Sequence, residues 1–134
     1  KGRQQVLATV EEVIRRSLPL EFYLIGDPQG DVPKRLASAF TWSGRYEEAE
    51  LGAKILEAQG DVFLFASQAP ETYSYTLTAA IRSGLPIVAT HLGAFVERLA
   101  GLPSARTVAP DIAPAELVGI LMSISSPAGQ GKSR

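Results

Sequence analysis

The chain has no cysteine, and it has only one histidine and one methionine among its 134 residues. Without cysteine it can form no disulfide and use no thiolate nucleophile, and the usual structural zinc sites lack their ligands. A membrane-spanning helix needs about 18 or more consecutive apolar residues, and the sequence contains no such run. Residues 1–16 are polar and amphipathic and lack the apolar core of a signal peptide. These absences make a cytoplasmic protein without a transmembrane segment the expectation.

Charge is also low and balanced. A net charge of -1 and a pI near 5.9 exclude the basic surface that is typical of nucleic-acid-binding domains. The hydrophobic fraction of 46% and the charged fraction of 20% are those of an ordinary globular protein, and the length suits a single core. We expect one folded domain over residues 1–125. Residues 126–134 are small, polar and rich in glycine and proline, which predicts a flexible tail.

Apolar periodicity divides the chain into alternating helices and strands. Helices are expected at residues 6–17, 47–59, 72–83, 94–99 and 114–124, and strands at 22–25, 39–43, 62–65, 87–89 and 106–108. In the second helix, Ala49, Ala53 and Leu56 share one side, and Gly60 marks its end. Short connections favour right-handed crossovers, and thus an α/β fold with a Rossmann-like parallel sheet and helices on both faces. Because the order opens with a helix, we expect this sheet to lack its first strand.

Residues 61–97 carry most of the functional information. They follow the order strand, loop, helix, strand, which places a ligand at the carboxyl edge of a parallel sheet. Glu71 stands in the loop, where its carboxylate can accept hydrogen bonds from two vicinal hydroxyls of a sugar or ribose. The N–H groups of the helix start that follows suit a phosphate. Glu71 could equally cap this helix and complement its dipole.

Residues 69–99, APETYSYTLTAAIRSGLPIVATHLGAFVERL, resemble the donor-binding segment of the family 4 (group 1) retaining glycosyltransferases of the GT-B fold. That family has a Glu-x7-Glu pattern, an ASGLPVVAT-like run and a Gly-Ala/Gly-x-x-x-Glu ending. Other elements follow in the family's order, namely Lys1-Gly2, EFYLIG, FTWSGRYEEAEL and DVFLFAS. The resemblance covers residues 1–116.

This resemblance implies the C-terminal, donor-binding half of a glycosyltransferase of the hexosyltransferase type. Such an enzyme moves a sugar from a nucleotide diphosphate sugar to an acceptor hydroxyl with retention, and neither a metal nor another cofactor is expected. The acceptor site would belong to an N-terminal half as the partner, through which the enzyme could also lie at a membrane surface. The isolated chain is therefore expected to bind donor and to transfer nothing.

Four site residues follow from the resemblance at the phosphate and sugar end. Glu71 falls on the first glutamate of the pattern, beside the hydroxyls of the transferred sugar, and is the candidate catalytic residue. Ser74 and Tyr75 fall where backbone amides meet the diphosphate. Lys1 falls on a lysine that pairs with phosphate, for which a single ammonium is a sound partner.

At the nucleoside end, Gly44, Arg45 and Tyr46 fall where a loop backbone lies along the base. The second glutamate of the pattern should stand eight residues after Glu71, and that position is Ala79. Alanine cannot accept the ribose hydrogen bonds, so binding of the donor loses on the order of 1.5–3 kcal/mol of free energy. Three explanations remain open: a donor held differently, a ribose contact from elsewhere, or weakened or lost donor binding.

Two other functions also remain open. Ala79 and the missing strand would suit an interaction or scaffold module with a degenerate donor site. A sugar-phosphate isomerase or epimerase would need an acid–base pair, for which only Glu71 and His91 are candidates. For His91, loop packing is favoured over a metal role. Glu97 matches the family's terminal glutamate, or it holds a loop through backbone amides.

Overall fold

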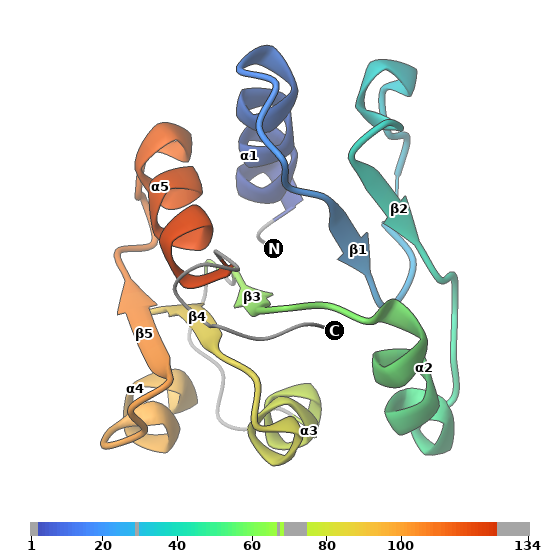
Figure 1. The fold of residues 1–134 in the computed structure, drawn as a ribbon. Coiled ribbons are helices and arrows are strands. Elements are labelled where there is room, and N and C mark those ends of the chain that lie inside the picture. The colour runs from blue at the N-terminus through green and yellow to red at the C-terminus, as the bar shows by residue number, and fades with distance from the viewer. Residues whose placement is uncertain (1–2, 29, 67, 69–74, 126–134) are drawn as a thin grey trace.

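The computed structural model describes residues 3–28, 30–66, 68 and 75–125, and helices and strands alternate along these ranges (Figure 1). The α-helices are α1 (Arg3–Arg15), α2 (Leu51–Ala58), α3 (Tyr75–Ser83), α4 (Ala94–Leu99) and α5 (Pro114–Ser125). Two short 3-10 turns are η1 (Lys34–Leu36) and η2 (Glu48–Glu50). The strands are β1 (Phe22–Leu24), β2 (Phe40–Trp42), β3 (Phe63–Phe65), β4 (Ile87–Thr90) and β5 (Ala105–Val108). The expected order of elements is confirmed.

Every strand pair is parallel, but the pairs fall into two groups. β1 pairs with β2, and β3, β4 and β5 pair in that order. The register aligns Phe22 with Phe40, Phe63 with Ile87, and Ile87 with Ala105. Parallel strands joined through helices on both faces confirm the predicted α/β, Rossmann-like fold class.

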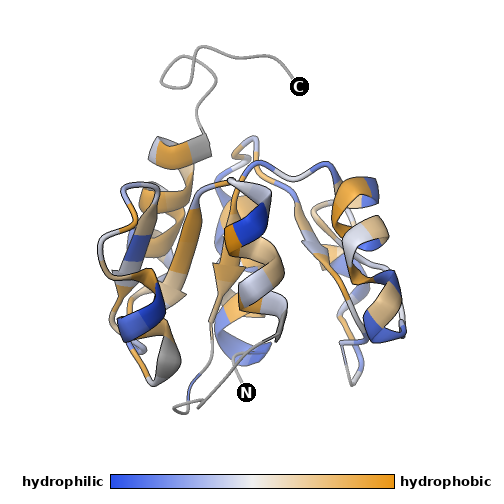
Figure 2. Cartoon of the chain, turned by 90° about the horizontal axis from the view of Figure 1, so that it is seen from below, coloured by the Kyte–Doolittle hydropathy of each residue, from blue (hydrophilic) through white to orange (hydrophobic). Residues whose placement is uncertain are grey.

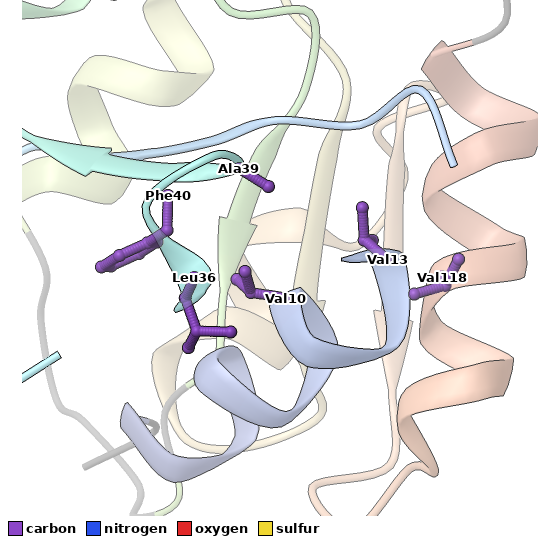
Figure 3. Close-up of a cluster of buried hydrophobic side chains, with 6 residues drawn as sticks. All are labelled: Val10, Val13, Leu36, Ala39, Phe40 and Val118. Atoms are coloured by element: carbon purple, nitrogen blue, oxygen red, sulfur yellow. The ribbon is translucent and has the colours of Figure 1, made fainter. Parts of the chain in front are cut away.

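Helices cover the strands from both sides. α1 and α5 lie on one side, and α2, α3 and α4 lie on the other (Figure 1). On the α1 side a buried cluster joins α1, η1, β2 and α5 through Val10, Val13, Leu36, Ala39, Phe40 and Val118 (Figure 3). A neighbouring cluster includes Val88 of β4 and Leu117 of α5, and Phe22 of β1 and Leu64 of β3 both pack against it. The α1 side therefore has one nearly continuous core across both groups of strands.

The opposite face has its own core. Leu77, Ala80, Ile87, Ala89, Phe95 and Leu99 form a buried cluster between β4, α3 and α4. β4 thus sends Val88 to one side and Ile87 to the other, which explains why its sequence is apolar without alternation. Figure 2 shows apolar strand segments behind helices in which hydrophobic and hydrophilic residues alternate. Of the helices in the described ranges, none combines the length and the apolar character that crossing a membrane requires.

The second helix differs from the sequence prediction. Its first turn is the 3-10 turn η2, and the side that carries Ala49, Ala53 and Leu56 faces solvent, with Leu56 78% exposed. Leu51 supplies the buried contact instead. The helix ends at Ala58, one residue earlier than predicted, because Gln59 itself adopts the left-handed conformation that was expected at Gly60. Helical spacing shows which residues share a side but does not show which side meets the core.

A positive φ at the end of α3 gives a first prediction. Gly84 follows the helix with φ +79° and donates its N–H to Ile81 O at 3.2 Å. Gly84→Ala should lower the free energy of unfolding by about 1 kcal/mol, because an L side chain is strained in this region. Gly119 lies inside α5 with open space around it. As the matched control, Gly119→Ala should raise stability by roughly 0.5–1 kcal/mol.

Urea unfolding of both variants measures these changes. Equal shifts in the two variants would show that the conformation of Gly84 does not decide its effect.

Candidate functional site

The strands are parallel within each group, so the carboxyl ends of β1 and β2 meet at one edge of their pair, as do those of β3, β4 and β5 in the other group. Residues 25–31 follow β1, residues 43–47 follow β2, and residues 66–74 lie between β3 and α3. Gly44, Arg45 and Tyr46, which are predicted to lie along the base, fall in the loop after β2 and therefore at the carboxyl edge of β1 and β2.

Ser43 joins the loops that follow β1 and β2. Its N–H donates to Leu24 O at 2.9 Å, and its hydroxyl oxygen accepts the N–H of Gly26 at 3.0 Å. Gly44 then donates its N–H to Gly26 O at 2.9 Å. Gly26 and Gly44 have φ values of +137° and +86°, which suit glycine. These bonds continue the pairing of β1 and β2 beyond the strands and fix the backbone at Gly44.

A cavity of about 710 Å³ opens at these loops. It is lined by Leu24, Ile25, Gly26 and Asp27 after β1 and by Arg45, Tyr46, Glu47 and Glu50 before α2. The Tyr46 ring lies over the first loop, with its Cε1 3.9 Å from the point where a Cβ on Gly26 would stand. The structure thus brings the predicted Gly44–Tyr46 loop to a cavity of the size that small ligands occupy.

Three carboxylates and one guanidinium give this cavity its charge, from Asp27, Glu47, Glu50 and Arg45. Glu50 Oε1 accepts the backbone N–H of Glu47 at 2.9 Å, which holds the carboxylate at the start of η2. A carboxylate offers about four acceptor positions, so this bond leaves room for hydroxyl donors. An excess of negative charge disfavours phosphate here and suits the hydroxyls and N–H groups of a nucleoside.

The third loop is described only at Ala66 and Gln68, and α3 begins at Tyr75. Glu71, Ser74 and Lys1 lie outside the described residues, so their roles stay predictions.

Ala79 is half-buried on α3. Its neighbour Thr78 accepts a hydrogen bond from Arg98 Nη2 at 2.6 Å, which ties α3 to α4.

The family model of the glycosyl transferases group 1 matches residues 1–123. The chain belongs to this family. No curated protein and no solved structure gives a significant match to it. Membership establishes glycosyl transfer as the chemistry of this family domain, and a nucleotide-sugar donor is the substrate that the family suggests.

The edge of the glycosyltransferase domain near β4 carries the single histidine. His91 is exposed, its N–H donates to Val108 O at 2.8 Å, and its Nδ1 lies 3.0 Å from Thr107 Oγ1. These contacts hold the loop after β4 against β5, which agrees with a packing role.

Glu97 is exposed on α4, and the buried Thr90 hydroxyl has no hydrogen-bond partner in the part of the chain that the structure describes. Nor do three or more His, Asp or Glu side chains gather there in a possible metal site.

Sequence reasoning missed the polar contacts of the first turn of α1. Arg3 Nε donates to Pro28 O at 3.1 Å, and its Nη2 donates to Asp31 O. Gln5 Nε2 donates to Ile112 O at 2.6 Å, and Gln68 Nε2 donates to Gln5 Oε1 at 3.2 Å. The start of α1 is thus held by the loops after β1 and β3 and before α5. The sequence signal was weak, because these residues only looked like the polar side of an amphipathic helix.

Proposed function

We propose that this group 1 glycosyltransferase domain binds the nucleotide-sugar donor of a retaining sugar transfer. The observation that carries the proposal is the cavity at Gly26, Arg45 and Tyr46, on the carboxyl edge of β1 and β2. The nucleoside would lie in this cavity, with its base against the Tyr46 ring. Stacking on an aromatic ring contributes about 1–3 kcal/mol per base.

The ribose needs a hydrogen-bond acceptor that Ala79 cannot provide. Glu50 lines the cavity, and its carboxylate is held in place by the Glu47 N–H at 2.9 Å. This arrangement favours a ribose contact from elsewhere among the three explanations for Ala79. Glu50 would then accept one ribose hydroxyl, while the position of the second glutamate itself, Ala79, offers no acceptor for the other.

The diphosphate and the sugar would lie towards β3 and α3. The start of α3 carries the positive end of the helix dipole, and Lys1 would add an ammonium. Both would stabilise the negative charge that develops on the departing diphosphate, which needs no metal. Glu71 would bind hydroxyls of the transferred hexose.

A thermal-shift and calorimetry series with UDP, GDP, ADP and their glucose conjugates tests the proposal. A ligand at 100 times its Kd stabilises a folded protein by about 2.7 kcal/mol, so a bound donor raises the melting temperature measurably. Tyr46→Ala should weaken the binding of the best ligand by about tenfold or more through lost stacking. If none of these ligands stabilises the chain, the donor-site proposal is wrong.

Tyr23→Ala is the matched control. Tyr23 is also an aromatic residue and is 40% exposed, but it lies on β1 and does not line the cavity. Its replacement should leave nucleotide affinity unchanged after correction for stability. Equal weakening by both substitutions would indicate a general loss of structure and not a lost contact with the base.

We further propose that catalysis needs the surface of a second, acceptor-binding domain, since the acceptor has to meet the donor in a cleft. The chain by itself should then bind donor without transferring sugar. Measurable turnover by the 134-residue chain would contradict this.

The alternative is an interaction module with a degenerate donor site. Ala79 favours it, because the position lacks the expected carboxylate. The same ligand panel separates the two functions. Stabilisation by any nucleotide supports the donor domain, and the absence of stabilisation by every ligand supports the interaction module.

A further inference from the structure

The first turn of α1 contacts loops of both groups of strands. Arg3 Nε donates to Pro28 O at 3.1 Å in the loop after β1. Gln5 accepts a hydrogen bond from Gln68, which follows β3, and donates to Ile112 O, which follows β5. A nucleotide sugar whose nucleoside lies at the cavity beside β1 and whose sugar lies near α3 has its diphosphate between these loops. Arg3 therefore lies in the region where the diphosphate of a bound donor is expected.

The loop after β1 is built around the guanidinium of Arg3. Nε donates to Pro28 O, and Nη2 donates to Asp31 O. Gly30 lies against the face of the group, because a Cβ there would stand 3.1 Å from Nη2, 3.2 Å from Cζ and 3.5 Å from Nε. The φ of +152° at Gly30 also favours glycine. A side chain at residue 30 would displace the guanidinium, so this loop fixes where the cation lies.

These contacts use one edge of the guanidinium and leave the N–H groups of the other edge for a ligand. Arginine has five N–H donors, and within the described ranges Nη1 of Arg3 bonds to no other residue. Nor does Arg3 pair with a carboxylate in those ranges, whereas Arg15, Arg16 and Arg35 each pair with a glutamate. The half-buried Arg3 thus presents a positive charge that is held in place but not neutralised.

This charge is unfavourable for the helix that carries it. The amino end of a helix is the positive end of its dipole, where acidic side chains are stabilising and basic ones are not. The first turn of α1 contains no acidic residue, and Arg3 is its first residue. A neutral donor such as glutamine could bond to the loop carbonyls without this cost. An anion beside Arg3, in contrast, would be attracted by the guanidinium and by the helix end together.

We propose that Arg3 binds the diphosphate of the nucleotide-sugar donor, through Nη1 and the second hydrogen of Nη2. A guanidinium can bond to two phosphate oxygens at once, which a single ammonium does less well. It would also offset the repulsion between the diphosphate and Asp27, Glu47 and Glu50 at the neighbouring cavity. The inference rests on the proposed donor function, and it adds a residue to which the family pattern gave no role.

Paired titrations with a nucleoside diphosphate and its nucleoside test the inference. Arg3→Gln removes the charge but keeps a donor for the loop, so it should weaken the binding of the preferred ligand among UDP, GDP and ADP by about tenfold or more. The matching nucleoside has no phosphate, and its affinity should change by less than about twofold. Calorimetry measures the diphosphate, and NMR titration measures the weaker nucleoside. If Arg3 only held the loop beside the cavity, both affinities would fall equally.

Arg15→Gln is the matched control. Arg15 is also an arginine of α1, but it lies at the carboxyl end and pairs with Glu12 at 2.6 Å. Its substitution changes the net charge equally and should leave both affinities within about twofold of the parent values. Arg3→Lys keeps the charge without the planar fork, so its affinity for the diphosphate should lie about threefold or more below the parent and above Arg3→Gln. If urea unfolding shows that Arg3→Gln does not fold, Arg3→Lys is compared with the parent in the same way.

Three results overturn the inference, and they can be told apart. If Arg3→Gln leaves the diphosphate affinity unchanged while Tyr46→Ala weakens it, the donor function stands and Arg3 has no part in it. If Arg3→Gln weakens nucleoside and diphosphate equally, Arg3 is a structural contact of the loop. If no nucleotide binds the parent chain, the donor function fails and this inference fails with it.

Discussion

Replacing Phe95 with alanine is expected to lower the free energy of unfolding by about 3–5 kcal/mol, the largest change that we predict for a single substitution. Phe95 is 1% exposed and lies in the cluster between β4, α3 and α4. Its ring centroid is 5.6 Å from that of Phe65, at the carboxyl end of β3. The substitution removes the buried area and this aromatic contact, and it leaves a cavity that rigid neighbours fill only in part. The total free energy of unfolding of natural domains is about 5–15 kcal/mol, so the variant should be only marginally folded at 37 °C.

Urea unfolding followed by circular dichroism measures the change, with Leu56→Ala as the control. Leu56 is also a large apolar residue on a helix, but it is 78% exposed, and its truncation should change stability by less than about 0.5 kcal/mol. A loss below about 1 kcal/mol in Phe95→Ala would mean that the α3–α4 core is not a main source of stability.

Phe65→Ala, measured alone and combined with Phe95→Ala, should show a coupling of about 0.5–1.5 kcal/mol in the free energy of unfolding.

The order of elements and the parallel sheet could be predicted from the sequence, because each depends on local patterns. Residues 87–89 were expected to form a strand, and the structure confirms a strand there, which lies between β3 and β5 with both faces covered. Residues 114–124 were similarly expected to form a helix, and α5 covers them, with Leu117 and Leu121 buried. The family pattern also led to Arg45 and Tyr46, which the structure places at a cavity.

Other features depend on contacts between distant segments, and the sequence did not reveal them. The side of α2 that carries Leu56 had the spacing of a buried stripe, but α2 packs near α3 and leaves that side in solvent. The bonds from Arg3 and Gln5 join positions 25 and 107 residues apart, and nothing local marks them. Nor did the sequence reveal that β1 pairs with β2 while β3, β4 and β5 form a second group, although Phe22 and Leu64 pack against one core.

Ala79→Glu is expected to tighten the binding of the preferred nucleotide diphosphate by about 10-fold to 150-fold. This range corresponds to about 1.5–3 kcal/mol, the contribution of a hydrogen bond to a charged group. Ala79 is half-buried on α3, one turn before the exposed Arg82. Glutamate is a good helix former, so the substitution should be tolerated there. Isothermal titration calorimetry of the parent and variant chains measures the gain.

Ala79→Gln separates charge from size in this experiment, since it adds a side chain of the same length without a carboxylate. It should recover only a small part of the gain, because hydrogen bonds to a neutral amide contribute about half as much or less.

Glu50→Gln in the parent chain tests the competing source of the ribose contact and keeps an acceptor for the Glu47 N–H. If Glu50 holds the ribose, Glu50→Gln weakens binding by about tenfold, and Ala79→Glu restores what was lost. If Ala79→Glu changes nothing while Glu50→Gln weakens binding, the ribose lies beside η2 and out of reach of α3. If neither substitution changes an affinity that Tyr46→Ala does weaken, the nucleoside is held by its base and the ribose contacts neither carboxylate.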